Sequence, residues 1–301
     1  MNKVAVLMST YNGAKYLREQ IDSVLCQIDV ELSLIIRDDL SSDETKDILL
    51  SYKETHNNIT VIYGRKNLGP CLSFIDLIQS QSDYDYYALA DQDDIWNEDK
   101  LITAIEALSS YGNVPALYHS NLTIADETGK ACRISHSKPR DLKNKYAPLI
   151  SFSATGCTIV YNAALAKLLA EKRPTGFSMH DTYLVAVASL FGKVVYDFSP
   201  HILYRQHSEN VIGTYTNKKT LSVYISRFKS SFCSHKHPMQ HNAKVLRELF
   251  ADDLSNTDIE VLEEIINYDH SLISKVKLLL DKRLKGIWRK RDIINVLLGQ
   301  L

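Results

Sequence analysis

Residues 90–96 read Ala-Asp-Gln-Asp-Asp-Ile-Trp and directly extend the apolar run Tyr-Tyr-Ala-Leu-Ala at positions 86–90. A continuous apolar run is typical of an interior strand of a parallel sheet, and ligands of open α/β sheets bind beyond the carboxyl ends of the strands. Clustered carboxylates repel one another, and a hard divalent cation with oxygen ligands relieves that repulsion, usually while it also contacts phosphates. The stretch therefore predicts a site for Mg²⁺ or Mn²⁺ beside a diphosphate. The alternative is that these are solvated loop acids, with Asp94 or Asn97 capping the next helix.

The bulk properties are those of an ordinary globular protein with room for one large domain and an appendage, or for two modest domains. The chain has 301 residues and a formal net charge of −1, so no overall basic field indicates a nucleic-acid partner. No apolar run approaches the roughly 20 residues that a membrane-spanning helix needs. The five cysteines lack paired spacing, and Met1 leads straight into a strand pattern, which favours a cytoplasmic protein.

Four apolar runs separated by helical periodicity predict a β-α-β-α-β-α-β order over the first 90 residues. The expected strands cover residues 4–8, 32–36, 59–63 and 86–90. No G-x-G-x-x-G follows the first strand, so a dehydrogenase-type dinucleotide site is not indicated. The turn there offers Thr10, Tyr11 and Asn12 instead, groups suited to a nucleotide base, and Asp39 could accept a hydrogen bond from a base N–H or a ribose hydroxyl.

Each of these polar residues also has a structural alternative as a turn residue or helix cap. Residues 41–44, Ser-Ser-Asp-Glu, resemble a capping box that opens the second helix. Residues 67–70, Asn-Leu-Gly-Pro, predict the turn into the third helix.

The second half of the predicted sheet is less regular. A helix over residues 101–108, a strand at 116–120 and a turn at 126–129 are expected, followed by a long polar loop at 133–148 that is a candidate lid. Further strands are expected at 155–161, 194–197 and 202–204. Asp181 opens an apolar helix, where a cap and a catalytic acid are equally good interpretations, and His207 is eligible as a metal ligand or a structural histidine.

The ordered set of motifs resembles the inverting, GT-A-type glycosyltransferases of family 2, especially bacterial rhamnosyltransferases of cell-surface polysaccharide assembly. The resemblance covers roughly residues 3 to 215 and rests on six segments in the right order. These segments are residues 8–13 (MSTYNG), 37–43 (RDDLSSD), 67–69 (NLG), 91–96 (DQDDIW), 179–181 (MHD) and 204–207 (YRQH). Two positions depart from the family pattern: Leu40 stands where glycine is usual, and His180 stands where many members have glutamate, which favours the rhamnosyltransferase branch.

The resemblance implies a GT-A fold, Rossmann-like, with a mostly parallel sheet flanked by helices and a C-terminal all-helical appendage. It implies Asp181 as the catalytic base and a metal, Mg²⁺ or Mn²⁺, at Asp91, Asp93 and His207. The expected donor-binding residues are Thr10, Tyr11, Asn12, Asp39, Asn67, Asp91, Gln92 and His207. The expected acceptor-side residues are Trp96, Gly156, Cys157 and His180.

The chemistry agrees with this residue set. A metal would neutralise charge growing on a nucleoside diphosphate, and a carboxylate would take the proton of the acceptor hydroxyl. A single inverting displacement needs no enzyme nucleophile, so no Ser-His-Asp or Cys-His pattern is expected. We expect dTDP-rhamnose as the donor and a lipid-linked or growing polysaccharide as the acceptor. The alternatives are a UDP-hexose donor, or a non-catalytic subunit that binds sugar nucleotides.

After a catalytic domain at 1–217, residues 218–301 predict only helices, at 221–232, 243–250, 259–280 and 287–298. Six basic residues between Lys282 and Arg291 lie among Leu284, Ile287, Trp288 and Ile293. This amphipathic basic pattern is compatible with an anionic membrane surface, which would make the protein peripheral at the inner face of the membrane. A solvated helical face or a homo-oligomer contact is an equally good interpretation.

Overall fold

The structure is a computed structural model that describes residues 1–136, 144–151, 154–207 and 238–300. The chain forms two compact units. The first contains residues 1–141, 154–173 and 191–207, and the second contains residues 142–153, 174–190 and 208–301. The boundary expected between residues 217 and 218 lies outside the described residues, and the second unit includes two segments that precede it.

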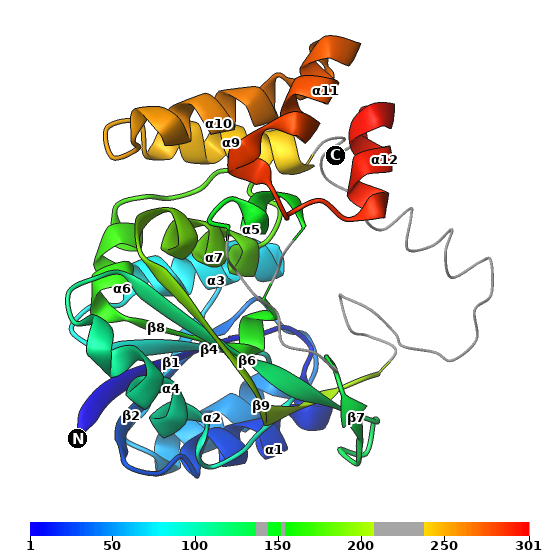
Figure 1. Cartoon of the computed structure of the whole chain (residues 1–301). Helices are drawn as coiled ribbons and strands as arrows, with labels where there is room; N and C mark the ends of the chain where they lie inside the picture. The colour runs from blue at the N-terminus through cyan, green and yellow to red at the C-terminus, as the bar shows by residue number, and fades with distance from the viewer. Residues whose placement is uncertain (137–143, 152–153, 208–237, 301) are drawn as a thin grey trace. The chain divides into compact units, whose positions relative to one another are not determined.

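The first half of the sheet is parallel, as its apolar runs predict (Figure 1). Its spatial order is β3-β2-β1-β4, and the strands are β1 (Asn2–Thr10), β2 (Val30–Asp38), β3 (Ile59–Tyr63) and β4 (Tyr86–Ala90). Helices α1 (Ala14–Leu25), α2 (Thr45–Thr55) and α3 (Gly69–Ser80) connect them. The register pairs Met8 of β1 with Ala90 of β4 and Thr10 with Asp38 of β2. The polar turns that follow these strands therefore gather at one edge of the sheet.

The second half of the sheet is mixed. It contains β8 (Ile159–Asn162), β6 (Ala116–Ala125), β9 (Lys193–Arg205), β5 (Ile95–Trp96) and, paired to β6, β7 (Ala131–Ile134). β8 is antiparallel to both β4 and β6, whereas β9 is parallel to β6. The two short strands expected at 194–197 and 202–204 are one strand, β9, whose pairing with β6 shifts register near Asn121.

Helices cover both faces of this sheet in the first unit. Figure 1 shows α1, α2 and α4 (Lys100–Leu108) along one face and α3 and α6 (Ala163–Ala170) along the other. The alternation of side chains along a strand explains the two layers, because Val4 and Val6 pack with Leu17 of α1 while the intervening residues face the opposite side. This three-layer arrangement confirms the expected α/β fold class.

The second unit is helical in its described residues. It contains α5 (Ala147–Ile150), α7 (His180–Phe191), α9 (Pro238–Leu249), α10 (Asn256–Ile266), α11 (Leu272–Leu280) and α12 (Lys290–Leu298). Only the last residue of α7, Phe191, is assigned to the first unit. The helix expected over 259–280 is interrupted by a 3₁₀ turn at Tyr268–His270, and the helix expected from 287 begins at Lys290. The helix expected over 221–232 lies outside the described residues. No described helix has the length and apolar character to cross a bilayer.

Hydrogen bonds join distant segments within this second unit. The Tyr146 hydroxyl donates to the Asp258 carboxylate at 2.7 Å, and Lys145 pairs with the same carboxylate at 2.6 Å. Ser151 donates to the carbonyl of Ile287 at 3.1 Å. The C-terminal helices are therefore bonded to residues that come long before them in the chain.

Three local predictions are corrected. Residues 41–44 are not a capping box, because α2 has Glu44 at its N-cap without a side-chain cap, while the Ser41 hydroxyl accepts from the Asn12 N–H. Neither Asp94 nor Asn97 caps α4, whose N-cap is Asp99 without a side-chain cap. The polar stretch at 133–148 is not all loop, since β7 and α5 occupy its ends; residues 137–143 lie outside the described part.

Candidate active site

The acidic stretch after β4 is held in place by Arg205 at the end of β9. The backbone N–H of Arg205 donates to the Asp94 carboxylate at 3.1 Å, and its Nε donates to the carbonyl of Asp93 at 2.8 Å. The rest of its guanidinium donates to the carbonyl of Glu127 and pairs with the Glu19 carboxylate at 2.5 Å. This buried side chain has few rotamers left, so it fixes the backbone on which the predicted metal ligands stand.

Asp93 and His207, both predicted as metal ligands, are brought together. The Asp93 Oδ2 and His207 Nε2 atoms lie 2.8 Å apart, and their side chains are 15% and 7% exposed. The His207 ring also packs on the Tyr16 ring, with 4.8 Å between centroids. A carboxylate and an imidazole are thus bonded to each other, with part of each still exposed, at the carboxyl edge of the sheet.

Asp91 lies in a second cluster with Asp94 and Cys157, whose ligand atoms are within 4.8 Å of one another. Burial, reinforced by the charges of Asp93 and Asp91, raises the pKa of Asp94 well above its usual value. Burial and the neighbouring acids likewise raise the pKa of the Cys157 thiol, which hydrogen-bonds to Asp94. A buried, protonated thiol is a poor ligand for Mg²⁺ or Mn²⁺, which prefer oxygen ligands.

Beneath this stretch lies the buried Lys100, whose ammonium is 3.5 Å from the Trp96 ring centroid. Burial lowers the pKa of Lys100 to about 7, and the Nζ atom has no hydrogen-bond partner in the described chain. Trp96, predicted on the acceptor side, is itself buried in the core. Its ring contacts Lys100 in this structure, which indicates a structural role.

The turn after β1 is bonded directly to the acidic stretch. The Tyr11 N–H donates to Gln92 Oε1 at 2.8 Å, and Gln92 Nε2 donates to the Tyr11 carbonyl at 3.1 Å. We call these two bonds the Gln92–Tyr11 amide pair. A Cβ at Gly13 would lie 2.2 Å from Gln92 Oε1, so the amide pair needs glycine at that position. Tyr11 keeps an exposed side chain, as a base-stacking residue requires.

Asn12 and Thr10 support the same turn. Asn12 takes a positive φ of 48°, and its side-chain oxygen accepts from the Ser42 N–H at 2.8 Å. The Thr10 hydroxyl faces the Asp38 carboxylate at 3.3 Å and is buried. Direct donor contacts by these two side chains stay predictions.

Asp39 is more occupied than the sequence indicates. Its carboxylate pairs with Arg37 at 2.5 Å and accepts from the N–H groups of Leu68 and Gly69 at 2.8–2.9 Å. Asn67, which is exposed, closes the same turn by accepting from the Gly69 N–H at 2.9 Å. Asp39 thus fixes the turn before α3, and its contact with a nucleotide base stays a prediction.

His180 and Asp181 lie at the start of α7, in the second unit. Burial raises the pKa of Asp181 to about 6 and lowers the pKa of His180 to about 3, so His180 is neutral at pH 7. The Asp181 carboxylate accepts from its neighbour Thr182, through the backbone N–H at 2.5 Å and the hydroxyl at 3.2 Å. A carboxylate with a pKa near 6 suits a general base at neutral pH.

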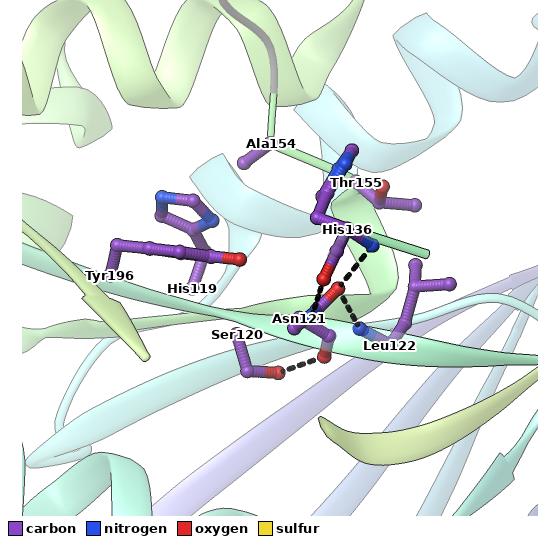
Figure 2. Close-up of a pocket in the computed structure, with 8 residues that line it drawn as sticks. All are labelled: His119, Ser120, Asn121, Leu122, His136, Ala154, Thr155 and Tyr196. Carbon is purple, nitrogen blue, oxygen red and sulfur yellow. Dashed lines mark hydrogen bonds between the residues drawn. The ribbon is translucent and has the colours of Figure 1, made fainter. Parts of the chain in front are cut away.

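A polar pocket is lined in part by Ala154 and Thr155, which directly precede the predicted acceptor-side residues Gly156 and Cys157 in the sequence. Figure 2 shows its lining: His119, Ser120, Asn121, Leu122, His136, Ala154, Thr155 and Tyr196. The Asn121 side chain accepts from the N–H groups of Leu122 and His136 and donates to the His136 carbonyl at 2.9 Å. Asn121 therefore fixes the chain just beyond β7, while Gly156 and Cys157 are buried in a 3₁₀ turn.

Sequence reasoning missed the three buried cations of the site. Arg37 pairs with the Asp39 carboxylate, Arg205 bonds the acidic stretch, and Lys100 lies buried against the Trp96 ring, yet the sequence patterns assigned none of them a role. Arg37 and Arg205 each stand at the end of an apolar strand, where a cation enclosed by neighbouring acids is a usable signal. Lys100 carries no such signal, because a lysine opening a helix is ordinarily solvated.

A glycosyltransferase of the GT-A type is the class that this sheet and its acidic carboxyl edge define. The profile of glycosyltransferase family 2 matches residues 5–169, so the chain belongs to that family. Among curated relatives, the dTDP-rhamnosyl transferase RfbG of Shigella flexneri is 30% identical over 217 residues, which cover 68% of this chain and 73% of the relative. The putative teichuronic acid biosynthesis glycosyltransferase TuaG of Bacillus subtilis is 34% identical over 103 residues, covering 34% and 40% of the two chains.

Solved structures agree on the fold. TarS of S. aureus, residues 1–349 in complex with UDP-GlcNAc, matches with a TM-score of 0.59 and 16% identity over 98% of this chain and 81% of that one. The mannosyltransferase PcManGT of Pyrobaculum calidifontis, in complex with GDP-Man and Mn²⁺, matches with a TM-score of 0.51 and 14% identity over 100% and 88%. At these identities the likeness shows the GT-A fold alone.

Proposed function

We propose that this family 2 glycosyltransferase moves a sugar, with inversion, from a nucleoside-diphosphate sugar to a hydroxyl of a lipid-linked or growing polysaccharide. The observation that carries the proposal is the Asp93–His207 pair, because it places two ligand types at the carboxyl edge where α/β sheets bind phosphates. Asp181 supplies the base.

The pair fits a divalent metal. Asp93 Oδ2 and His207 Nε2 are hydrogen-bonded at 2.8 Å, close to the roughly 3 Å between ligand atoms on neighbouring vertices of an octahedron, so a metal bound by both atoms would replace this hydrogen bond. Both side chains retain some exposure, whereas Asp94 and Cys157 are fully buried, and burial raises the pKa of each. Asp93 and His207 would thus hold Mg²⁺ or Mn²⁺, which supplies charge neutralisation at the diphosphate when bound. Asp91, predicted as a third ligand, lies in the cluster with Asp94 and Cys157.

The chain's own residues divide the remaining work. Arg205 and the Gln92–Tyr11 amide pair orient the acidic stretch, and the exposed Tyr11 ring is available to stack on a base. Asp181 takes the acceptor proton, helped by a pKa raised to about 6. The neighbouring His180 is neutral, so it adds no charge that would pull the Asp181 pKa down.

We propose dTDP-rhamnose as the donor, because RfbG is named as a dTDP-rhamnosyl transferase and is similar over two thirds of this chain. The His180-Asp181 pair supports the same branch of the family. A UDP-hexose is the competing donor, and TarS, which binds UDP-GlcNAc, has the same fold.

The test is a screen of dTDP-rhamnose and UDP-hexoses by nucleotide release, with and without chelator. We expect Mg²⁺- or Mn²⁺-dependent release, and a drop of about 10²-fold or more in His207→Ala and in Asp93→Asn. Lys53→Gln, on the exposed side of α2, is the matched control and should keep full activity. Full activity of His207→Ala in chelator would refute the metal assignment, and preferential release of UDP would refute the choice of donor.

A further inference from the structure

Helices α11 and α12 expose an unusual amount of apolar surface. Seven of the seventeen large hydrophobic side chains exposed in the described chain lie between residues 272 and 298, and they are 45–82% exposed. They are Leu272, Ile273, Val276, Leu280, Ile294, Leu297 and Leu298, a set we call the α11–α12 face. Apolar residues concentrated in this way mark interaction surfaces.

Their spacing is helical. Ile273, Val276 and Leu280 follow one another at three and four residues, and on α12 Leu297 and Leu298 lie three and four residues after Ile294. In α11 only Leu278 is buried, so most of this apolar helix points away from its own unit. The two helices pack together, and the Lys275 ammonium donates to the Leu297 carbonyl at 3.0 Å.

The same segment is strongly basic. Residues 272–298 contain eight Lys and Arg against two Asp, a formal charge of +6 in a chain whose net charge is −1. Arg283 pairs with Asp281, Glu260 and Glu264, and Lys277 pairs with Glu264, all acids of their own unit. The exposed cations that form no ion pair with an acid among the described residues are Lys282, Lys285, Arg289 and Lys290.

The sequence predicts that Leu284 and Ile287 form the apolar side of a membrane-binding surface together with these cations, and the structure corrects this prediction. Leu284 and Ile287 are buried in the second unit, and residues 282–289 are a 3₁₀ turn and a connection, not an amphipathic helix. The apolar side chains available to a partner are therefore those of α11 and α12.

From this geometry we infer that the α11–α12 face docks on an anionic lipid bilayer. Exposed leucine and isoleucine beside unpaired lysine is the chemistry of interfacial helices, whose apolar groups enter the headgroup region while cations meet anionic lipids. A second copy fits less well, because a two-fold interface would set the same +6 segment against itself. The inference goes beyond the proposed function, since this surface has its charge and exposure whether or not the chain transfers a sugar.

The test is co-sedimentation of the purified full chain with vesicles of phosphatidylcholine alone or mixed with phosphatidylglycerol. We expect binding to the anionic vesicles only, weakened as salt rises. Each lysine near an anionic surface is worth about 5-fold in partitioning, so Lys282→Gln/Lys285→Gln/Lys290→Gln should lose about 100-fold. Ile273→Gln/Leu280→Gln should also lose binding, because the apolar anchor is removed.

The matched control is Leu50→Gln/Lys53→Gln, an exposed leucine and lysine on α2, which should bind like the unaltered chain. Circular dichroism melts establish that each variant is folded. Nucleotide release is measured in parallel and should be unchanged in the α11 variant; absence of release from every donor would count against the proposed function and leave the vesicle result standing. Equal binding to neutral vesicles, or an Ile273→Gln/Leu280→Gln variant that keeps vesicle binding but turns a dimer into a monomer in light scattering, would overturn the inference.

Discussion

Asp181 is a carboxyl whose burial sets the pH at which it can accept a proton. Its pKa is raised to about 6, so the carboxylate that a general base needs is present above that pH and lost below it. We expect transfer to fall about tenfold per pH unit below 6, and Asp181→Asn to lower transfer about 10²-fold or more with donor affinity kept. The measurement is a pH profile of kcat and KM; an Asp181→Asn enzyme with near-normal turnover would refute the role.

The same burial has a cost in stability that can be measured separately. The unfolded carboxyl has a pKa near 3.8, so between pH 3.8 and 6 the unfolded state ionises first, and stability falls as pH rises, by on the order of 3 kcal/mol in total. The change in the free energy of unfolding caused by Asp181→Asn should therefore be more stabilising at pH 7.5 than at pH 4.

Asp197 is the matched control with the opposite sign. Its pKa is lowered by bonds from Ser199, Tyr118 and His201, which outweigh burial, so its contribution is present above pH 4 and lost in acid. Asp197→Asn should destabilise the protein at pH 7.5. Equal losses from both substitutions in urea unfolding would contradict the assignment for Asp181.

Leu40 holds a backbone conformation that favours glycine. Its φ is +72°, which strains a leucine, and its side chain is 46% exposed, so little burial offsets that strain. Leu40→Gly should raise the free energy of unfolding by up to about 1 kcal/mol. Leu50→Gly, at 48% exposure inside α2, should lower it by about 1 kcal/mol. If both variants lose stability alike, Leu40 contributes packing that outweighs its strain.

At the level of elements, the β1–α1 turn and the acidic stretch are coupled by the Gln92–Tyr11 amide pair. Gly13→Ala would push the Gln92 amide aside and break both hydrogen bonds, each worth about 1 kcal/mol. We expect weaker donor binding in Gly13→Ala. In a Gln92→Ala background the added methyl meets open space, so Gly13→Ala should then cost little.

A double-mutant cycle measured by nucleotide titration gives the coupling. Additive losses from Gly13→Ala and Gln92→Ala would show that the alanine harms the turn in some other way.

The elements that the sequence predicts best are those whose burial leaves a local pattern. The parallel strands β1 to β4 follow from continuous apolar runs, and their shared register explains why the acidic edge was predicted. β7 could not be found, because all four of its residues are exposed and show no alternation. β6 extends past the strand predicted at residues 116–120 to Ala125, through the buried Asn121, whose burial depends on pairing with distant strands.

For the site, Asp91, Asp93 and His207 could be named from motif order. The close approach of Asp93 and His207 follows from the pairing of β5, which begins just after Asp93, with β9, which ends just before His207. The buried cluster of Asp94 and Cys157 could not be predicted, because it depends on a contact between residues 63 positions apart and on complete burial. Pairing across such distances leaves no periodic trace in the sequence.

At the scale of the whole molecule, the C-terminal helices are not a detachable appendage. Residues 142–153 and 174–190 belong to the same compact unit as residues beyond 208, and Asp258 receives bonds from both Lys145 and Tyr146. A chain ending at residue 207 would leave those segments without their partners. We expect it to melt without cooperativity or to aggregate, and Tyr146→Phe in the full chain to cost about 1 kcal/mol.

Calorimetry of the full chain and of a chain ending at residue 207 tests whether the first 207 residues fold independently. A truncated chain that is monomeric and melts cooperatively at the temperature of the full chain would show that the first 207 residues fold independently.

The hydrogen bond between Tyr146 and Asp258 can form only after the ribosome has synthesised Asp258. Its two ends are 112 residues apart, and ribosomes add roughly 5–20 residues per second, so Tyr146 waits on the order of ten seconds for its partner to be made. During that interval the apolar side of α7, with Leu184 and Val187 among its buried residues, has been translated but cannot yet be enclosed by its completed unit. The parallel sheet β1 to β4 meets no such delay, because all of its strands lie within the first 90 residues. The nascent chain is thus most exposed to chaperones and proteases late in translation, and slowing the ribosome between codons 190 and 258 should lower the yield of folded protein more than slowing it before codon 90.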